Sequence, residues 1–312
     1  MTETGRAYAK INISLDIISK MDNGYHSLKT IMQTVSLCDE ITIECIPGET
    51  GDGSLSRSET RQRTVPCLTV PLCSTVRIVD SGCYFLPKDD RNIAAKAAKI
   101  FLEHTGISGY DLKISVKKNI PVCAGLGGGS ADGACVLRML DKMFKTNLER
   151  DTLIKLGSAI GSDVPFCIFG GTMLAEGRGE ILTDIAPMPM CHIVICKPSF
   201  SFSTPELFKR VNCRKIQIRP DTDEIIAALS NNDLQSVAQR VYNVFEDFVP
   251  RGASEIEDIK SVLLDNGALG SVMTGSGPTV FGIFEDRASA DKAYADLKKE
   301  YSDTYLAQPV EN

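Results

Sequence analysis

The N-terminal segment alternates regularly between apolar and polar side chains. Its apolar positions, each two residues from the next, are Ala7, Ala9, Ile11, Ile13, Leu15 and Ile17. Lys10 and Asn12 share the opposite, polar face. Because successive side chains of a strand point to opposite faces, this period of two predicts a half-buried strand. A turn is expected at 22–24, where Asp, Asn and Gly meet, and a second β-rich run at 30–45.

Helical spacing begins after Asn92. Apolar residues then recur three and four positions apart, at Ile93, Ala94, Ala97, Ala98, Phe101 and Leu102. That spacing places them on one face of a helix. We expect a strand at 112–117, a glycine-rich segment, and helices at 130–143 and 151–159 to follow. Residues 47–75 carry Gly, Ser, Thr, Arg and Pro without periodicity, which predicts a long loop or hairpin insertion.

The second half of the chain carries shorter elements. Apolar and glycine-rich stretches at 164–175 lead to a strand expected at 191–196. The helices expected next cover 221–229, 233–244 and 254–266. A β-loop-β unit at 270–284 and a helix at 287–300 complete the pattern. Strands that come first, with helices clustered later, are typical of an α+β architecture rather than of regular βαβ winding.

Composition and charge narrow the possible classes of protein. With 312 residues, 43% of them hydrophobic, the chain can form two domains or one two-lobed domain with a cleft. A net charge of −6 argues against nucleic acid as a partner, because unspecific binding to phosphates needs a basic surface. No long apolar run predicts a membrane span, and the polar first residues do not resemble a signal peptide. We therefore expect a cytoplasmic protein that does not act at a membrane.

The cysteines and histidines do not predict a metal centre. Eleven cysteines occur without a CxxC pair, and the chain has only three histidines. Apolar neighbours and an odd count are typical of reduced, buried thiols in the cytoplasm. A zinc site needs clustered ligands, so none is expected.

One glycine-rich segment stands between a predicted strand and a predicted helix. It consists of Pro121, Val122, Cys123, Ala124, Gly125, Leu126, Gly127, Gly128, Gly129, Ser130 and Ala131. Glycines let the backbone approach an anion closely, and successive N–H groups with a helix N-terminus form a phosphate nest. Ser130 either caps the helix or offers its hydroxyl to Mg²⁺. The segment therefore predicts a site for the phosphates of ATP, and the alternative is a flexible connector.

Two commoner phosphate loops do not match this segment. A Walker A loop ends in Gly-Lys-Ser/Thr, and no lysine occurs between residues 119 and 137. The dinucleotide fingerprint requires glycine at position 130, where the chain has serine.

The segment resembles the central motif of the GHMP kinases, named after galactokinase and the homoserine, mevalonate and phosphomevalonate kinases. Residues 9–12 and 273–281 resemble the first and last motifs of that family. Residues 23–26, 161–166 and 175–180 are similar to members that phosphorylate an alcohol linked to cytidine diphosphate. Cys123 and Ala124 stand where the family often has glycine, and the insertion at 47–75 is longer than usual. The alternative is another small-molecule kinase of the family, of the homoserine or mevalonate type.

The resemblance implies a two-lobed α+β fold with the active site in the cleft. It implies an N-terminal domain at 1–165 and a C-terminal domain at 166–312. It also implies transfer of the γ-phosphoryl group of ATP, with Mg²⁺, to a tertiary alcohol, the cytidine diphosphate serving as a handle. Nothing in the sequence indicates an oligomeric state.

The resemblance assigns the reacting groups as well. It implies that Asp163 is the catalytic carboxylate that accepts the hydroxyl proton, although Asp at this place also suits a helix N-cap or turn. Lys10 would stabilise charge on the transferred phosphoryl group, the alternative being an ordinary solvent-exposed lysine. Asn12 would either bind the substrate alcohol or pair with a neighbouring strand.

The cytosine end of the substrate is assigned by resemblance too. Tyr25 and His26 would stack on the base and hydrogen-bond it, whereas such a pair beside a turn is otherwise structural. Phe208 would offer a second ring, or simply pack its helix, and Thr204 is assigned to the substrate with it. The loop at 275–279 would close over the substrate or support the first glycine loop. Its alternative is a tight turn between two strands.

Overall fold

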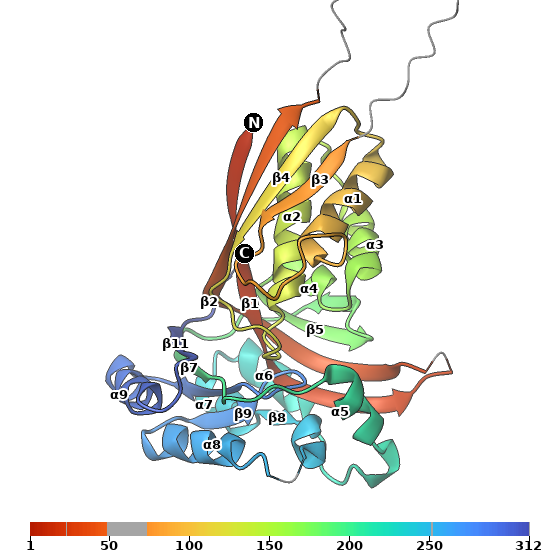
Figure 1. The fold of residues 1–312 in the computed structure, drawn as a ribbon. Helices are drawn as coiled ribbons and strands as arrows, with labels where there is room; N and C mark the ends of the chain where they lie inside the picture. The colour runs from red at the N-terminus through yellow and green to blue at the C-terminus, as the bar shows by residue number, and fades with distance from the viewer. Residues whose placement is uncertain (23, 49–73, 251, 312) are drawn as a thin grey trace, which may run out of the picture.

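The structure is a computed structural model that describes residues 1–22, 24–48, 74–250 and 252–311. A large sheet runs in the order β3-β4-β2-β1-β8, with β5 on β2 and β6 on β5. Its strands are β1 (Thr2–Lys20), β2 (His26–Pro47), β3 (Thr75–Asp80), β4 (Tyr110–Lys117), β5 (Thr172–Gly177), β6 (Ile181–Asp184) and β8 (Tyr242–Asn243). The helices of this lobe are α1 (Ile93–Thr105), α2 (Gly128–Phe144), α3 (Arg150–Ile160) and α4 (Val164–Phe169). They lie together on one face of the sheet (Figure 1).

The second lobe is built on a smaller sheet of order β11-β7-β10-β9. Its strands are β7 (His192–Cys196), β9 (Gly270–Met273), β10 (Val280–Phe284) and β11 (Thr304–Ala307). Its helices are α5 (Thr204–Arg210), α6 (Thr222–Ser230), α7 (Leu234–Gln239), α8 (Glu255–Asp265) and α9 (Arg287–Lys298). Two 3₁₀ helices, Cys213–Lys215 and Val244–Phe248, stand among them.

The long strand β1 belongs to both lobes. It pairs with β2 from Thr2↔Glu44 to Lys20↔His26, and three register shifts interrupt the ladder. Such irregularities bend a strand pair, and the β1–β2 hairpin curves from the upper lobe across the lower one (Figure 1). Near its far end β1 pairs with β8 in parallel, Leu15 opposite Asn243. A strand shared in this way fixes the position of one lobe relative to the other.

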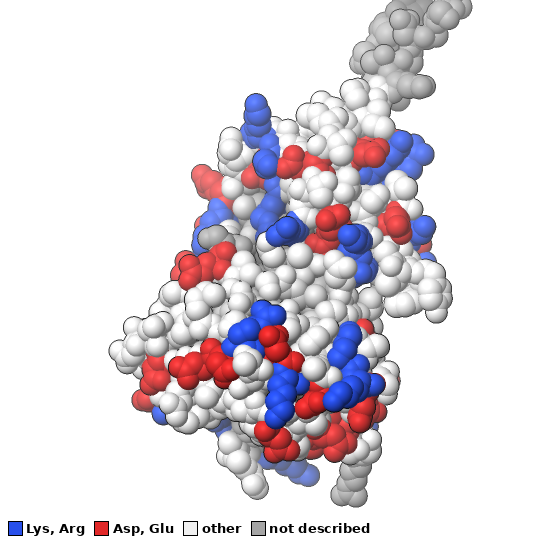
Figure 2. Space-filling view, turned by 90° about the vertical axis from the view of Figure 1, so that its left-hand side faces the viewer, with Lys and Arg blue, Asp and Glu red and all other residues white. Residues whose placement is uncertain are grey.

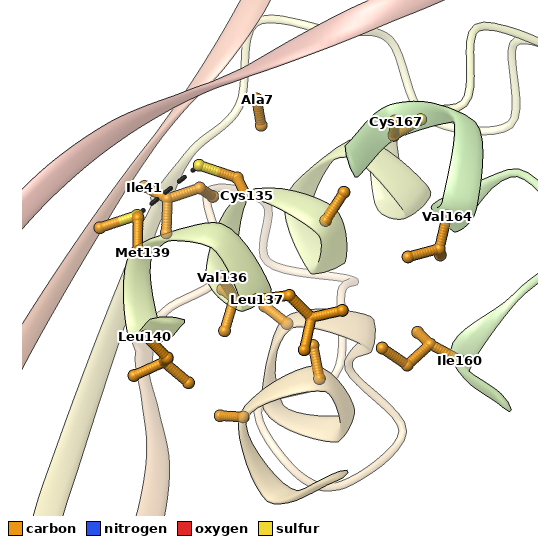
Figure 3. Close-up of a cluster of buried hydrophobic side chains, with 14 of the residues drawn as sticks. Ala7, Ile41, Cys135, Val136, Leu137, Met139, Leu140, Ile160, Val164 and Cys167 are labelled. Carbon is orange, nitrogen blue, oxygen red and sulfur yellow. Dashed lines mark hydrogen bonds between the residues drawn. The ribbon is translucent and has the colours of Figure 1, made fainter. Parts of the chain in front are cut away.

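The core of the first lobe is packed around α2 (Figure 3). Cys135 and Met139, one helical turn apart, lie toward β1 and β2, and their sulfur atoms are 3.6 Å apart. A Cβ atom on Gly5 of β1 would lie 2.8 Å from the Met139 sulfur. Gly5 therefore lets the helix approach the strand closely.

Charged side chains of both signs are interspersed over the face shown in Figure 2. No helix within the described ranges combines the length and the apolar character that crossing a membrane requires.

Most predicted elements are present. The alternating segment is β1, the run at 30–45 lies in β2, and the α+β prediction is confirmed. The boundary at 165/166 stays a prediction; β5 and β6, which follow it, pair within the first sheet. The insertion at 47–75 lies largely outside the described residues, and its last residue begins β3, a strand not expected.

The helix predicted at 233–244 is wrong in its second half. It ends at Gln239, because the chain then extends as β8 to pair with β1. The Asn243 side chain next accepts a hydrogen bond from the Phe245 N–H and starts a 3₁₀ helix. Tertiary pairing has overridden the local helical pattern here. The strand β11 was also not expected. The short helices α4 and α5 were raised only in the alternative interpretations of Asp163 and Phe208.

Candidate active site

A cavity of about 590 Å³ receives side chains from both lobes. Its wall includes β1 and β2 of the shared hairpin, the glycine-rich segment, the start of α5 and the loop at 275–277. Most of the predicted site residues line it. Three do not: Ala131 is buried in α2, and Tyr25 and His26 lie on the hairpin beside its far end.

The glycine-rich segment forms the turn that leads into α2. Gly127 has a left-handed backbone, φ +69°, and occupies the N-cap position, so the helix begins at Gly128. A Cβ on Gly127 would lie 3.0 Å from Cγ of Lys10. The first N–H groups of a helix lack partners within it, and here no side chain caps them among the described residues. Residues 127–130 line the cavity, with the positive end of the helix dipole behind them.

Ser130 lies in the first turn of α2 and lines the cavity. Of the two alternatives for Ser130, the helix cap is wrong because Gly127 holds that position. The described residues contain no cluster of three His, Cys, Asp or Glu side chains able to hold a metal ion.

Lys10, Asn12 and Asp163 lie together in the cavity wall. Nζ of Lys10 donates to Oδ1 of Asn12 at 2.7 Å and to the Gly125 carbonyl at 3.0 Å. It is 3.5 Å from Oδ2 of Asp163. Lys10 is only 4% exposed, so it is not the solvent-exposed lysine of the alternative interpretation. Asn12 also donates to the Thr30 hydroxyl at 2.8 Å, so it pairs with the neighbouring strand. Because Asn12 also lines the cavity, it remains in place to bind the substrate alcohol.

Asp163 stands at the N-cap position of α4. Its side chain makes no capping hydrogen bond within the described part of the chain, and 36% of it is exposed. The carboxylate is therefore available to the cavity, facing the Lys10 ammonium. This arrangement offers a base or orienting group beside a fixed positive charge.

The loop at 275–277 contacts the glycine-rich segment backbone to backbone. A Cβ on Gly125 would lie 2.3 Å from the Thr274 carbonyl oxygen, and a Cβ on Gly275 would lie 2.7 Å from the Gly125 oxygen. Both residues have positive φ, and no side chain fits between the two backbone segments. The loop thus joins β9 to β10 and also supports the first glycine loop from the other lobe.

Aromatic rings gather at the far end of the cavity. The rings of His26 and Phe208 are stacked with centroids 5.1 Å apart, and Phe245 meets Phe208 edge-on at 4.9 Å. Burial, helped by the Lys20 charge, lowers the pKa of His26. This shift favours the neutral imidazole. Thr204 lies beside these rings, with its hydroxyl 2.7 Å from that of Ser276.

Tyr25 is 56% exposed and is covered on one face by a guanidinium group. That group belongs to Arg178, whose Cζ lies 5.1 Å from the ring centroid. Arg178 lines the cavity but was not singled out in the sequence, because the motif that the segment 175–180 resembles does not specify its position.

A buried ionic cluster beneath the glycine loop was also missed. Asp39 is fully buried and accepts hydrogen bonds from the N–H groups of Asn119 at 2.6 Å and Ile120 at 2.8 Å. Lys118 pairs with Asp39 and, at 2.9 Å, with Asp132 of α2. Burial raises the pKa of Asp132 to about 7, with repulsion from Asp39 adding to it and Lys118 opposing it. Lys118 and Asp132 flank the glycines in the sequence, and that position could have indicated their role. Nothing in the sequence around Asp39 indicated that it joins them.

Comparisons with known proteins agree with this geometry. The model of the GHMP kinases N terminal domain matches residues 92–171, and that of the GHMP kinases C terminal matches residues 225–303. The 4-diphosphocytidyl-2-C-methyl-D-erythritol kinase of Clostridium botulinum (strain Alaska E43 / Type E3) is 39% identical over 98% of this chain and 99% of its own. The chain belongs to the GHMP kinase family.

Solved structures of GHMP kinases share the fold. A crystal structure of 4-(cytidine 5'-diphospho)-2C-methyl-D-erythritol kinase superposes with a TM-score of 0.77 at 26% identity, over 99% of this chain and 100% of that one. The L. major mevalonate kinase in complex with R-mevalonate gives a TM-score of 0.71 at 19% identity, over 100% of this chain and 98% of that one. Because GHMP kinases with different substrates share the fold, the fold alone does not identify the acceptor.

Proposed function

We propose that this GHMP kinase transfers the γ-phosphoryl group of ATP to the 2-hydroxyl of 4-diphosphocytidyl-2-C-methyl-D-erythritol, a step of the non-mevalonate isoprenoid pathway. The observation that carries the proposal is a single cavity that joins three features. These are the N–H groups at the start of α2, the Lys10–Asp163 pair and the ring of Phe208, on which His26 stacks. The name of the clostridial relative, which is 39% identical over 98% of this chain, supports the same acceptor.

The proposed mechanism relies on positioning and charge. The N–H groups at 127–130 hold the phosphates, and Asn12 with Asp163 orients the substrate hydroxyl. As the hydroxyl oxygen bonds to phosphorus, Asp163 accepts its proton, the bond to the β-phosphate breaks and ADP leaves. Lys10, held by Asn12 and Gly125, stabilises the negative charge on the transferred group.

At the acceptor end we propose that cytosine binds beside the His26–Phe208 stack and Tyr25. A neutral imidazole suits this role, since it both donates and accepts hydrogen bonds. Thr204, at the same end of the cavity, would hydrogen-bond the substrate.

We further propose that Mg²⁺ accompanies ATP, with Ser130 as the protein ligand. Mg²⁺ commonly keeps several waters and takes one or two protein ligands together with substrate phosphates. The Ser130 hydroxyl in the first turn of α2 suits such a site without an acidic cluster. When bound, the ion would neutralise charge on the phosphates.

The assay that tests the proposal supplies ATP and Mg²⁺ with one candidate alcohol at a time and follows ADP release. We expect turnover with the cytidine diphosphate substrate to exceed that with homoserine and mevalonate by orders of magnitude. Equal or higher turnover with homoserine or mevalonate would assign the chain to another activity of the family.

A further inference from the structure

One buried side chain in β8 touches both ends of the candidate site through hydrogen bonds. Asn243, in β8, is 1% exposed. Its Nδ2 donates to the carbonyl of Met273 at 2.7 Å and to that of Gly275 at 2.8 Å. Its Oδ1 accepts from the N–H of Phe245 at 3.0 Å. The amide thus makes three hydrogen bonds, with both N–H donors used in one direction and its oxygen accepting in the other.

The two donor bonds act on the phosphate end of the cavity. They hold the chain at residues 273–275, where Gly275 packs against the Gly125 backbone. A Cβ on Gly275 would also lie 3.1 Å from Nζ of Lys10. The backbone that Asn243 fixes is therefore the surface on which Lys10 and the glycine loop rest. A displacement of this backbone would therefore move both Lys10 and the glycine loop.

The acceptor bond acts on the aromatic end. It starts the 3₁₀ helix Val244–Phe248 and so sets the direction of the Phe245 side chain. Phe245 meets Phe208 edge-on, and Phe208 stacks on His26. Because β8 pairs with β1 at Leu15, the amide is also fixed relative to the strand that carries Lys10.

We propose that Asn243 is a positioning residue that keeps the phosphate-binding loops and the base-binding rings in one fixed relation. The inference rests on the proposed function and deepens it, since it explains how donor and acceptor ends are aligned. An amide is required, because only a side chain with both NH₂ and C=O makes bonds of both kinds. Aspartate keeps the acceptor oxygen and the shape, but it sets a carboxylate against two carbonyl oxygens.

Two substitutions separate the two ends. For Asn243→Asp we expect kcat to fall about 10-fold to 100-fold, because small misplacement of reacting groups costs rates of this order. KM for the cytidine diphosphate substrate should stay within about twofold, because the Phe245 bond is retained. For Asn243→Ala we expect the same fall in kcat together with a rise of about 10-fold in this KM. If Asn243→Asp does not fold, Asn243→Ser replaces it, since a serine hydroxyl also accepts from a helix-start N–H.

Asn212→Ala is the matched control. Asn212 caps the other 3₁₀ helix in the same way, by accepting from the Arg214 N–H at 3.1 Å, and it lies outside the cavity wall. We expect this variant to keep both kinetic constants. If both Asn243 variants keep kcat and KM, or if Asn212→Ala changes them equally, the positioning role is wrong. Failure of the wild-type enzyme to use the cytidine diphosphate substrate would instead overturn the proposed function.

Discussion

The two glycine-rich loops that meet in the cavity are held in place by different kinds of interaction. The loop at 121–130 rests on charges: Asp39, Lys118 and Asp132 lie buried beneath it. The loop at 275–277 rests on neutral groups, since Asn243 binds its backbone and Thr274 hydrogen-bonds Asn12. The Glu246 carboxylate accepts a hydrogen bond from the Met273 N–H, two residues before this loop, at 2.6 Å.

The difference suggests a division of labour between the loops. The first loop has to bind a polyanion. The buried Lys118 ammonium, paired with two carboxylates, keeps the loop backbone in place when the polyanion binds. The second loop has to match the first in shape, and hydrogen bonds to carbonyl oxygens fix shape without adding charge. The geometry of the first loop should therefore depend on ionisation and that of the second on packing.

The largest effect is expected from a residue that neither loop contains. Asp163→Asn should lower turnover by about 10²- to 10⁴-fold, the usual contribution of a general base. Nucleotide binding, measured by calorimetry with ADP, should remain because both loops are unchanged. A loss of binding equal to the loss of turnover would show that Asp163 supports the loops rather than the chemistry.

Next in size is the removal of the buried cation from the first loop. Lys118→Met leaves Asp39 and Asp132 facing each other in the interior, and breaking a buried ion pair costs about 3–5 kcal/mol. The free energy of unfolding, from denaturant titration, measures this loss. Lys142→Met is the control: its ammonium pairs with Glu3 at 2.5 Å but is 74% exposed, and such pairs contribute about 0–1 kcal/mol. Similar losses in the two variants would contradict the ionic anchoring of the first loop.

These residues also show what the sequence could and could not predict. Alternation along β1 placed Lys10 and Asn12 on one face, and their side chains do touch. The same pattern suggested that this face is exposed, because a period of two does not reveal that a second lobe covers it. Asp39 contacts residues 79 to 81 positions away, and Asn243 contacts residues 30 and 32 positions away. Pairings of that kind are set by tertiary packing and leave no local periodicity.

The start of one helix and the end of another were predicted wrongly. The helix after the glycine segment was expected to start at Ser130 and begins at Gly128, because Gly127 takes the left-handed conformation that ends the loop. In the segment 233–244, pairing with β1 outweighed the helical pattern. The chemical grouping of the site was thus visible in the motifs, whereas its supports were not.

A smaller effect tests the contact between the loops. Gly125→Ala places a Cβ 2.3 Å from the Thr274 oxygen, and overpacking of this kind costs about 1–3 kcal/mol. Gly171→Ala is the control, because Gly171 has a similar positive φ, +73°, with nothing within 4 Å of its added Cβ. The difference between the two variants in free energy of unfolding isolates the contact from backbone strain. If the variants lose equal stability, the loops do not depend on close packing.

The last test concerns pH and separates the loops most directly. The Asp132 carboxyl has a pKa of about 7 in the folded protein, raised chiefly by burial, against about 3.9 in an unfolded chain. The folded state therefore binds this proton more tightly. Its contribution to stability is complete below about pH 4, is lost as the pH rises to about 7, and changes no further above that.

Asp132→Asn removes the titration while keeping the shape of the side chain. The free energy of unfolding of the wild type minus that of Asp132→Asn should accordingly fall between about pH 4 and pH 7. The matching variant of the second loop is Thr274→Val, whose side chain is fully buried and hydrogen-bonds the uncharged Asn12. Its difference from the wild type should be constant over that window, because the deleted hydroxyl does not titrate. A slope for Thr274→Val as large as that for Asp132→Asn would mean that both loops depend on ionisation, and the contrast between them would be lost.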